Sequence, residues 1–276
     1  MRKLFLILLM VITNIAAQET NGIKFFPEKL NIQPFAANIL EPRLGTQFDL
    51  NNNELRLNIS NSLDLARYES SGSDIYSIGA DLFTYTLLRS ETAFHFPVDA
   101  VDYLFGLNFG YRHLMDNSEY GIRARLSHIS AHFADGHFDG NTGKWKNGMT
   151  PRVYSREFIE LLPYYGFGQA RVYVGLTYIY HIDPAWIGKM NYQAGCDYYY
   201  KGFAGANIYP FLGYDFKLTD IKKYVSNSSL TAGVKFGHMY GRGVSVYLNY
   251  FNGNNIHGEY FDHPAEYSAI GFNLDL

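Results

Sequence analysis

The sequence is poor in cysteine and has no long apolar run, and these absences exclude several classes of protein. Cys196 is the only cysteine among 276 residues, which excludes an internal disulfide and a cysteine-rich zinc site. No segment of about 18 consecutive apolar residues follows the N-terminus, so no transmembrane helix is predicted. The net charge is only −3 and the basic residues are scattered, so the sequence indicates no nucleic-acid-binding surface.

The N-terminus has the pattern of a secretory signal peptide. Two basic residues precede a short apolar run at residues 4–12, and the small residues Ala16 and Ala17 follow it. The run is too short to span a bilayer as a helix, and no cysteine follows it that could carry a lipoprotein anchor. We therefore expect residues 1–17 to be a signal peptide and the mature chain to begin near Gln18.

Aromatic residues are abundant and are interleaved with polar ones. The chain has 24 Tyr and 21 Phe, and its mean hydropathy is only −0.16 although 47% of its residues are apolar. In residues 170–182 the even positions are apolar or aromatic, whereas the odd positions include Arg171, Gly175, Thr177 and His181. Because successive side chains of a strand point to opposite faces, such a strand has one apolar face and one polar face.

The same alternation recurs along the chain and predicts an all-β fold, a transmembrane antiparallel outer-membrane β-barrel of about twelve strands. The candidate strands run for about 10–15 residues, longer than those of most soluble sandwiches, and tyrosine crowds the ends of their apolar faces as in the aromatic girdles of membrane barrels. The expected strands are 43–50, 54–68, 74–90, 101–115, 119–132, 154–166, 170–182, 191–201, 206–219, 228–240, 243–252 and 264–276.

The expected connections alternate between short and long, with a long one between 219 and 228. Bacterial barrels have an even number of strands, short periplasmic turns and long outer loops, so both termini are expected in the periplasm. The barrel is assigned to residues 43–276, and residues 18–42, which lack periodicity, to a periplasmic lead-in or a plug. Gly271, Leu274 and Leu276 fit the ending of outer-membrane barrels that the barrel assembly machinery reads, so this machinery is an expected partner.

The strand 119–132 carries a His-x-Ser pair on the face that we expect to contact lipid. Its odd positions include Arg123 and Arg125, which belong in the lumen. His128 and Ser130 are therefore on the other face, near the outer rim, where the penalty for a charged side chain facing lipid falls to about 0–1 kcal/mol. Same-face neighbours are roughly 6.6 Å apart, a gap that a histidine and a serine can close to the hydrogen bond that a serine nucleophile needs.

This pair resembles the His-x-Ser of outer-membrane phospholipase A and of the lipid A deacylase barrels. The resemblance covers about three residues and implies Ser130 as nucleophile, His128 as base and a third residue that orients the histidine. Ala131 stands where these families usually have an asparagine. Glu157, on the apolar face of the next strand, is the expected third residue if the register brings it opposite His128, and Asp135 in the following loop is the alternative.

A broader resemblance covers most of the mature chain. The segments "LSHISAHFADG" and "YSRE" (154–157), with a glycine-rich ending that contains "YFNG", are similar to an uncharacterised Gram-negative outer-membrane barrel family known only as a domain of unknown function. This resemblance implies the fold and no activity.

Other interpretations of these residues stay open. His128 and Ser130 can be ordinary polar residues at the membrane interface, and the barrel can be a structural or accessory member of an outer-membrane complex or a small channel. His128 and His132 are about 13 Å apart as positions i and i+4 of a strand, too far to share a metal ion. No cofactor is expected, although Ca²⁺ in the loop with Asp135, His137 and Asp139 is an alternative. Outer-membrane lipids are the expected partners.

Overall fold

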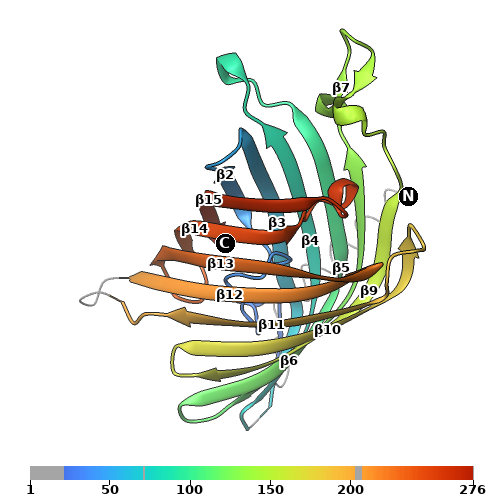
Figure 1. The fold of residues 1–276 in the computed structure, drawn as a ribbon. Coiled ribbons are helices and arrows are strands. Elements are labelled where there is room, and N and C mark those ends of the chain that lie inside the picture. Colours follow the sequence, from blue (N-terminus) through green and yellow to red (C-terminus); the bar gives the residue numbers. More distant parts are fainter. Residues whose placement is uncertain (1–21, 71, 203–206, 276) are drawn as a thin grey trace, which may run out of the picture.

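A computed structural model describes residues 22–70, 72–202 and 207–275, and most of the described residues are in β-strands (Figure 1). The predicted signal peptide and Leu276 lie outside the described residues. No helix in the described ranges is long and apolar enough to cross a membrane.

The strands are β1 (Ile23–Phe25), β2 (Leu44–Asp49), β3 (Glu54–Glu69), β4 (Asp74–Arg89), β5 (Val98–Leu114), β6 (Ser118–Phe133), β7 (Phe138–Asp139), β8 (Lys144–Trp145), β9 (Tyr154–Phe167), β10 (Ala170–Asp183), β11 (Met190–Tyr199), β12 (Ile208–Ile221), β13 (Lys223–Gly237), β14 (Gly243–Asn254) and β15 (Pro264–Asp275). The short 3-10 helices are η1 (Thr92–Phe94), η2 (Asp135–His137), η3 (Lys146–Gly148) and η5 (Gly258–Tyr260).

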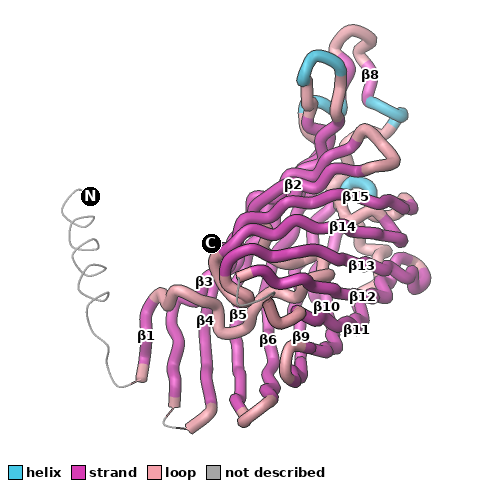
Figure 2. The backbone as a smooth tube through the Cα atoms, turned by 90° about the vertical axis from the view of Figure 1, so that its left-hand side faces the viewer, coloured by secondary structure: helices cyan, strands magenta, loops and turns pink. Residues whose placement is uncertain are grey.

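Twelve of the described strands close into one antiparallel barrel. Strands β2 to β6 and β9 to β15 each pair with two barrel neighbours, and the pairing of β3 with both β2 and β4 closes the ring. The short strand β1 adds a further pairing to one end of β3. One end of the barrel carries the connections 90–97, 134–153 and 255–263 with the 3-10 helices, and we call it the long-loop end (Figure 2). The other, the short-turn end, carries residues 115–117 and 168–169 and both ends of the described chain.

The twelve-strand barrel confirms the predicted fold class, but one predicted connection is wrong. The mostly polar composition of residues 220–227 predicts a long loop. Instead, β12 and β13 continue toward each other, pair Asp220 with Tyr224, and turn through a single residue, Lys222, whose φ is 61°. The polar side chains are accommodated because they bond one another across the hairpin, as Asn227 does with the Thr219 hydroxyl.

The two faces of the wall are chemically different, as the alternation predicts. The outward face exposes aliphatic residues at mid-height, among them Leu82, Leu126, Val174, Leu212 and Leu248. Exposed aromatic residues stand toward both barrel ends, including Tyr76, Tyr120, Tyr165, Tyr103, Tyr178 and Tyr250. This band of aliphatic residues between two aromatic rows matches the lipid-facing surface of outer-membrane barrels.

The lumen of the short-turn half is filled by residues 26–43, which run inside the barrel before β2 begins (Figure 1, blue). This internal segment is anchored at its centre by Phe35, which is only 1% exposed and packs against Tyr164 and Tyr173 of the wall. Arg171, which is paired with Asp197, donates hydrogen bonds to the main-chain oxygens of Gln33 and Pro34.

Glu41 ties the end of the internal segment to a buried ionic network. Its carboxylate accepts a 2.9 Å hydrogen bond from Arg123 and lies 3.4 Å from Arg125. Arg125 also contacts Asp81 at 3.0 Å and Glu160 at 3.3 Å, so arginines of the wall are shared between the segment and neighbouring strands. Each of these charges is almost fully buried and satisfied by a partner of opposite sign, as burial of a charge requires.

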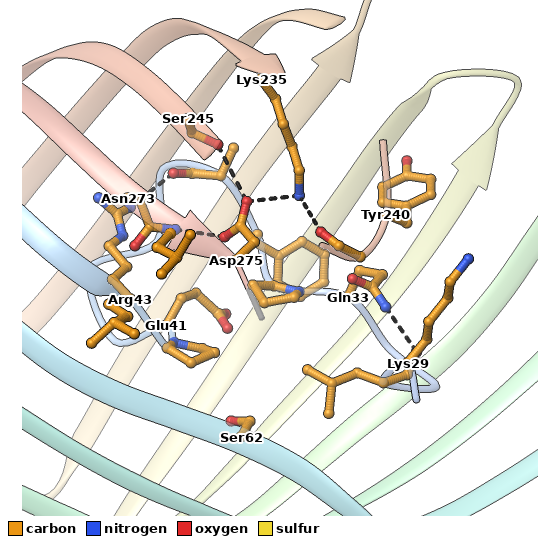
Figure 3. Close-up of a pocket in the computed structure, with 18 of the residues that line it drawn as sticks. Lys29, Gln33, Glu41, Arg43, Ser62, Lys235, Tyr240, Ser245, Asn273 and Asp275 are labelled. Carbon is orange, nitrogen blue, oxygen red and sulfur yellow. Dashed lines mark hydrogen bonds and ion pairs between the residues drawn. The ribbon is translucent and has the colours of Figure 1, made fainter. Parts of the chain in front are cut away.

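A polar cavity of about 280 Å³ remains beside the internal segment at the short-turn end (Figure 3). Its charged lining groups bond to one another: Lys235 contacts Asp275 at 2.7 Å and donates to the main-chain oxygen of Gly241. Asn273 also donates to Asp275. The cavity is large enough for several water molecules, each of which takes about 30 Å³ in the liquid.

The long-loop half of the lumen holds an apolar core instead. Its members are inward-facing residues of neighbouring strands together with residues of the loops above them, and they include Phe83, Leu104, Ile129, Phe158, Ile179, Ile182 and Phe261. Leu40 of the internal segment packs against this core from below. The internal segment and the apolar core together occupy both halves of the lumen.

We expect the purified protein to show no steady ion conductance in a planar bilayer, because both halves of the lumen are occupied by packed side chains. A general porin measured in the same bilayers serves as the positive control. Regular single-channel steps from the purified chain would contradict this expectation.

Replacing Glu41 with alanine should lower the free energy of unfolding by about 3–5 kcal/mol, since it leaves two buried arginines without their shared partner. The measurement is urea unfolding in detergent micelles, followed by the electrophoretic shift between folded and unfolded barrel. Glu28→Ala changes an exposed acidic residue of the same segment and should stay within about 0.5 kcal/mol of the wild type. Equal midpoints for the two variants would show that Glu41 does not anchor the segment.

Candidate active site on the outward wall

Four neighbouring strands, β5, β6, β9 and β10, bring polar residues into two rows near the long-loop end. The pairing registers of these strands set the rows. The first row is Phe105, His128, Glu157 and His181, and the second is Tyr103, Ser130, Ser155 and Asp183. The predicted residues His128, Ser130 and Glu157 are thus neighbours on adjacent strands.

His128 and Glu157 form a direct hydrogen bond. They are register partners, and His128 Nδ1 lies 2.6 Å from Glu157 Oε1. Since an ionised carboxylate only accepts hydrogen bonds, Nδ1 is the donor, and in the neutral imidazole Nε2 then presents its lone pair. This is the tautomer in which a histidine can accept a proton from a serine.

The surroundings of this pair are half-apolar. The side chains of His128 and Glu157 are 26% and 25% exposed, and the Phe105 ring lies 4.9 Å from the His128 ring. On the side toward mid-height, Leu126 precedes His128 on the outward face and belongs to the aliphatic band. On the side toward the long-loop end, the exposed Tyr103 is the register partner of Ser130. The pair therefore stands between the aliphatic band and the aromatic row of the long-loop end.

Ser130 stands two residues beyond His128 on the same outward face and is half-buried. Within the described part of the chain its hydroxyl makes no hydrogen bond, so Oγ of Ser130 is not bonded to Nε2 of His128 in this structure. Bonds between a catalytic base and its nucleophile are often long before substrate binds and shorten in the complex.

His181 is the member of the first row that the sequence pattern missed. Strict alternation places it with Arg171 and Thr177 on the lumen side, and this interpretation is wrong. The register between β9 and β10 shifts between Ile179 and His181, so Tyr180 is an extra residue and His181 turns outward. Its Nδ1 bonds Oε2 of Glu157. The sequence gives no clear signal of this shift, because Tyr180 and Ile182 continue the apolar set of even positions.

Asp135, the alternative orienting residue, lies apart from His128. It begins η2 in the loop after β6, and its carboxylate accepts a hydrogen bond from the backbone N–H of Gly136. Asp139 accepts hydrogen bonds from Asn141 and Thr142 within its own turn, and His137 is buried against Phe133. In the described ranges no three His, Cys, Asp or Glu side chains are placed together as metal ligands.

The loop after β14 covers the long-loop end next to this site. Arg152, just before β9, bonds Asp262 at 2.6 Å and the main-chain oxygen of Glu259. The hydrogen bonds from Arg152 lower the pKa of Asp262, whereas burial raises the pKa of Glu259. His257 of the same loop bonds the buried Asp102 of β5 at 2.6 Å. These contacts fix the loop over the lumen side of β5, β6 and β9.

Comparison with known proteins identifies the family. The family model described as a protein of unknown function, DUF1207, matches residues 104–275, which is more than half of the chain. The chain belongs to this family. No curated protein matches the sequence.

Solved structures of outer-membrane barrels resemble the fold of this DUF1207 protein. Outer membrane phospholipase A from Escherichia coli aligns with a TM-score of 0.52 at 15% identity, covering 96% of each chain. An active-site mutant of that phospholipase gives a TM-score of 0.53 at 15% identity, over 96% of this chain and 97% of the other. The β domain of the Bordetella autotransporter BrkA gives 0.44 at 13% identity, over 84% and 96%. At such identities the phospholipase structures support the fold alone.

The register that forms the first row can be tested with paired cysteines in a Cys196→Ser background. Direct antiparallel partners have Cα atoms about 4.5–5.5 Å apart, within the range of a disulfide. We therefore expect His128→Cys with Glu157→Cys to cross-link on mild oxidation, as detected by mass spectrometry of a non-reduced digest.

Ser130→Cys with Glu157→Cys is the matched control, because these positions are diagonal neighbours about 7–8 Å apart and should cross-link poorly. A reversed order of efficiency would show that β6 and β9 pair in another register.

Proposed function

We propose that this DUF1207 protein is a serine lipid acyl hydrolase of the outer membrane, with Ser130 as nucleophile, His128 as general base and Glu157 as the residue that orients His128. The hydrogen bond between His128 and Glu157, on the lipid-facing wall beside Ser130, carries the proposal. The pair stands beside a serine on the outward face, close to the aromatic row, which is where a hydrolase acting on membrane lipids would carry its base and nucleophile.

The reaction follows from the three positions. Ser130 Oγ attacks the carbonyl carbon of a lipid ester while Nε2 of His128 takes the hydroxyl proton. Glu157 accepts a hydrogen bond from Nδ1 throughout and stabilises the imidazolium that forms. His128 then gives the proton to the alcohol oxygen of the departing lyso-lipid, which leaves Ser130 acylated. A water molecule, deprotonated by His128, releases the fatty acid and restores the serine.

The location of the site sets the kind of substrate. The outward position of Ser130 points it at acyl chains and headgroups rather than at the filled lumen. If residues 1–17 direct export and both termini are periplasmic, the long-loop end faces outward and the substrate is a lipid of the outer leaflet, either a phospholipid or lipid A. Insertion in this orientation uses the barrel assembly machinery, with Gly271 and Leu274 in the last strand as part of its signal.

A channel has less support, since residues 26–43 and the apolar core occupy the two halves of the described lumen. A structural role in a larger complex requires only the barrel and makes no use of the polar row on the wall. The hydrolase accounts for both the barrel and that row.

The proposal is tested by the release of free fatty acid from mixed micelles of phosphatidylethanolamine and, separately, from lipid A. Ser130→Ala should reduce the rate to background. His128→Asn should lower it by about 10²–10⁴-fold, the usual contribution of a positioned general base. Wild-type protein should also be labelled at Ser130 by a fluorophosphonate probe, and Ser130→Ala should not.

Ser127→Ala is the matched control, because Ser127 is on the same strand but faces the lumen. It should keep both the rate and the labelling. The proposal is wrong if the wild type hydrolyses neither lipid, or if Ser130→Ala hydrolyses either one at the wild-type rate.

A further inference from the structure

His181 reaches Glu157 only because β10 contains a bulge. On either side of the bulge the pairing with β9 is regular: Ile179 opposes Phe158, and His181 opposes Glu157. If the pairing continued without a bulge, Tyr180 would oppose Glu157, and His181 would oppose Arg156 and face the lumen. A bulge costs ladder hydrogen bonds, and bulges often serve to redirect a side chain next to an active site.

The His181 ring bonds the carboxylate oxygen of Glu157 that His128 does not contact. His128 bonds Oε1, and His181 bonds Oε2 from the opposite side. A carboxylate that faces lipid with one oxygen unpaired would be free to rotate toward water at the membrane surface. With a histidine on each oxygen, one from β6 and one from β10, rotation in either direction breaks a charge-assisted hydrogen bond.

We propose that His181 is a positioning residue that holds the Glu157 carboxylate in the orientation required by His128. This inference rests on the proposed hydrolase. His181 is 67% exposed at the rim, and the Asp183 carboxylate is the next outward group on its own strand. Its role needs only the hydrogen bond from Nδ1, so its effect on the reaction passes through Glu157.

Three properties distinguish this role from direct contact with substrate. Loss of the His181 donor should lower kcat and leave KM unchanged, because binding of the lipid does not involve the ring. A side chain that keeps a donor near the position of Nδ1 should restore the rate. The effect should vanish when Glu157 has already been neutralised.

The test compares His181→Phe with His181→Asn in the fatty acid release assay. His181→Phe keeps a ring and removes the donor, and it should lower kcat by about 10–100-fold, since hydrogen bonds to charged groups contribute in that range. His181→Asn places an amide N–H near Nδ1 and should recover most of the lost rate. His132→Phe is the control, because it removes another exposed histidine from the same side of the barrel.

A double-mutant cycle completes the test. In a Glu157→Gln background, His181→Phe should cause no further loss of kcat. The inference is overturned if His181→Phe retains the wild-type kcat, if it raises KM alone, or if its effect is the same with and without Glu157. These outcomes are separate from failure of the proposed function, in which the wild type releases no fatty acid at all.

Discussion

The closed ladder of backbone hydrogen bonds is the constraint on which the remaining structure depends. Within a bilayer no water can satisfy an open sheet edge, so the chain has to return to its first strands and complete the ring. Once the ring is closed, every residue of a strand is committed to one of two surroundings, lipid or lumen. A shift of one residue in any pairing would exchange the two sets. The ionic network around Arg125 and the polar row around Glu157 both exist because this register is fixed.

Much of the barrel could be predicted because alternation is a local property. All twelve predicted strands, including 43–50, agree with the observed strands to within a few residues, except at the hairpin around Lys222. There, polar composition suggested a loop, whereas side-chain bonding across the hairpin stabilises strand. The outward direction of His128 is predicted from Arg123 and Arg125. These arginines are at odd positions and are expected to face the lumen, so the even position of His128 faces outward. Local composition thus predicts which side of the wall a residue faces better than it predicts where a strand ends.

The arrangement of the site was only partly predictable. Glu157 could be named because its strand follows β6 and its position has the correct parity, but only the register brings it opposite His128. Strict alternation puts His181 on the wrong side of the wall, because a bulge changes parity without leaving a clear mark in composition. The path of residues 26–43 inside the barrel could not be predicted either. This segment has no periodicity, and the arginines that hold it come from strands that are distant in the sequence.

The apolar core in the long-loop half of the lumen has a consequence for the opposite side of the wall. A barrel wall is a single layer, so Ile129 occupies the position between His128 and Ser130, and Phe158 follows Glu157 directly. Ile179 and Ile182 flank the bulge that turns His181 outward. The packing of the apolar core therefore helps to fix the positions of the outward side chains on the same strands. In this family, substitutions hidden in the lumen are therefore expected to move the groups on the same strands that face the membrane.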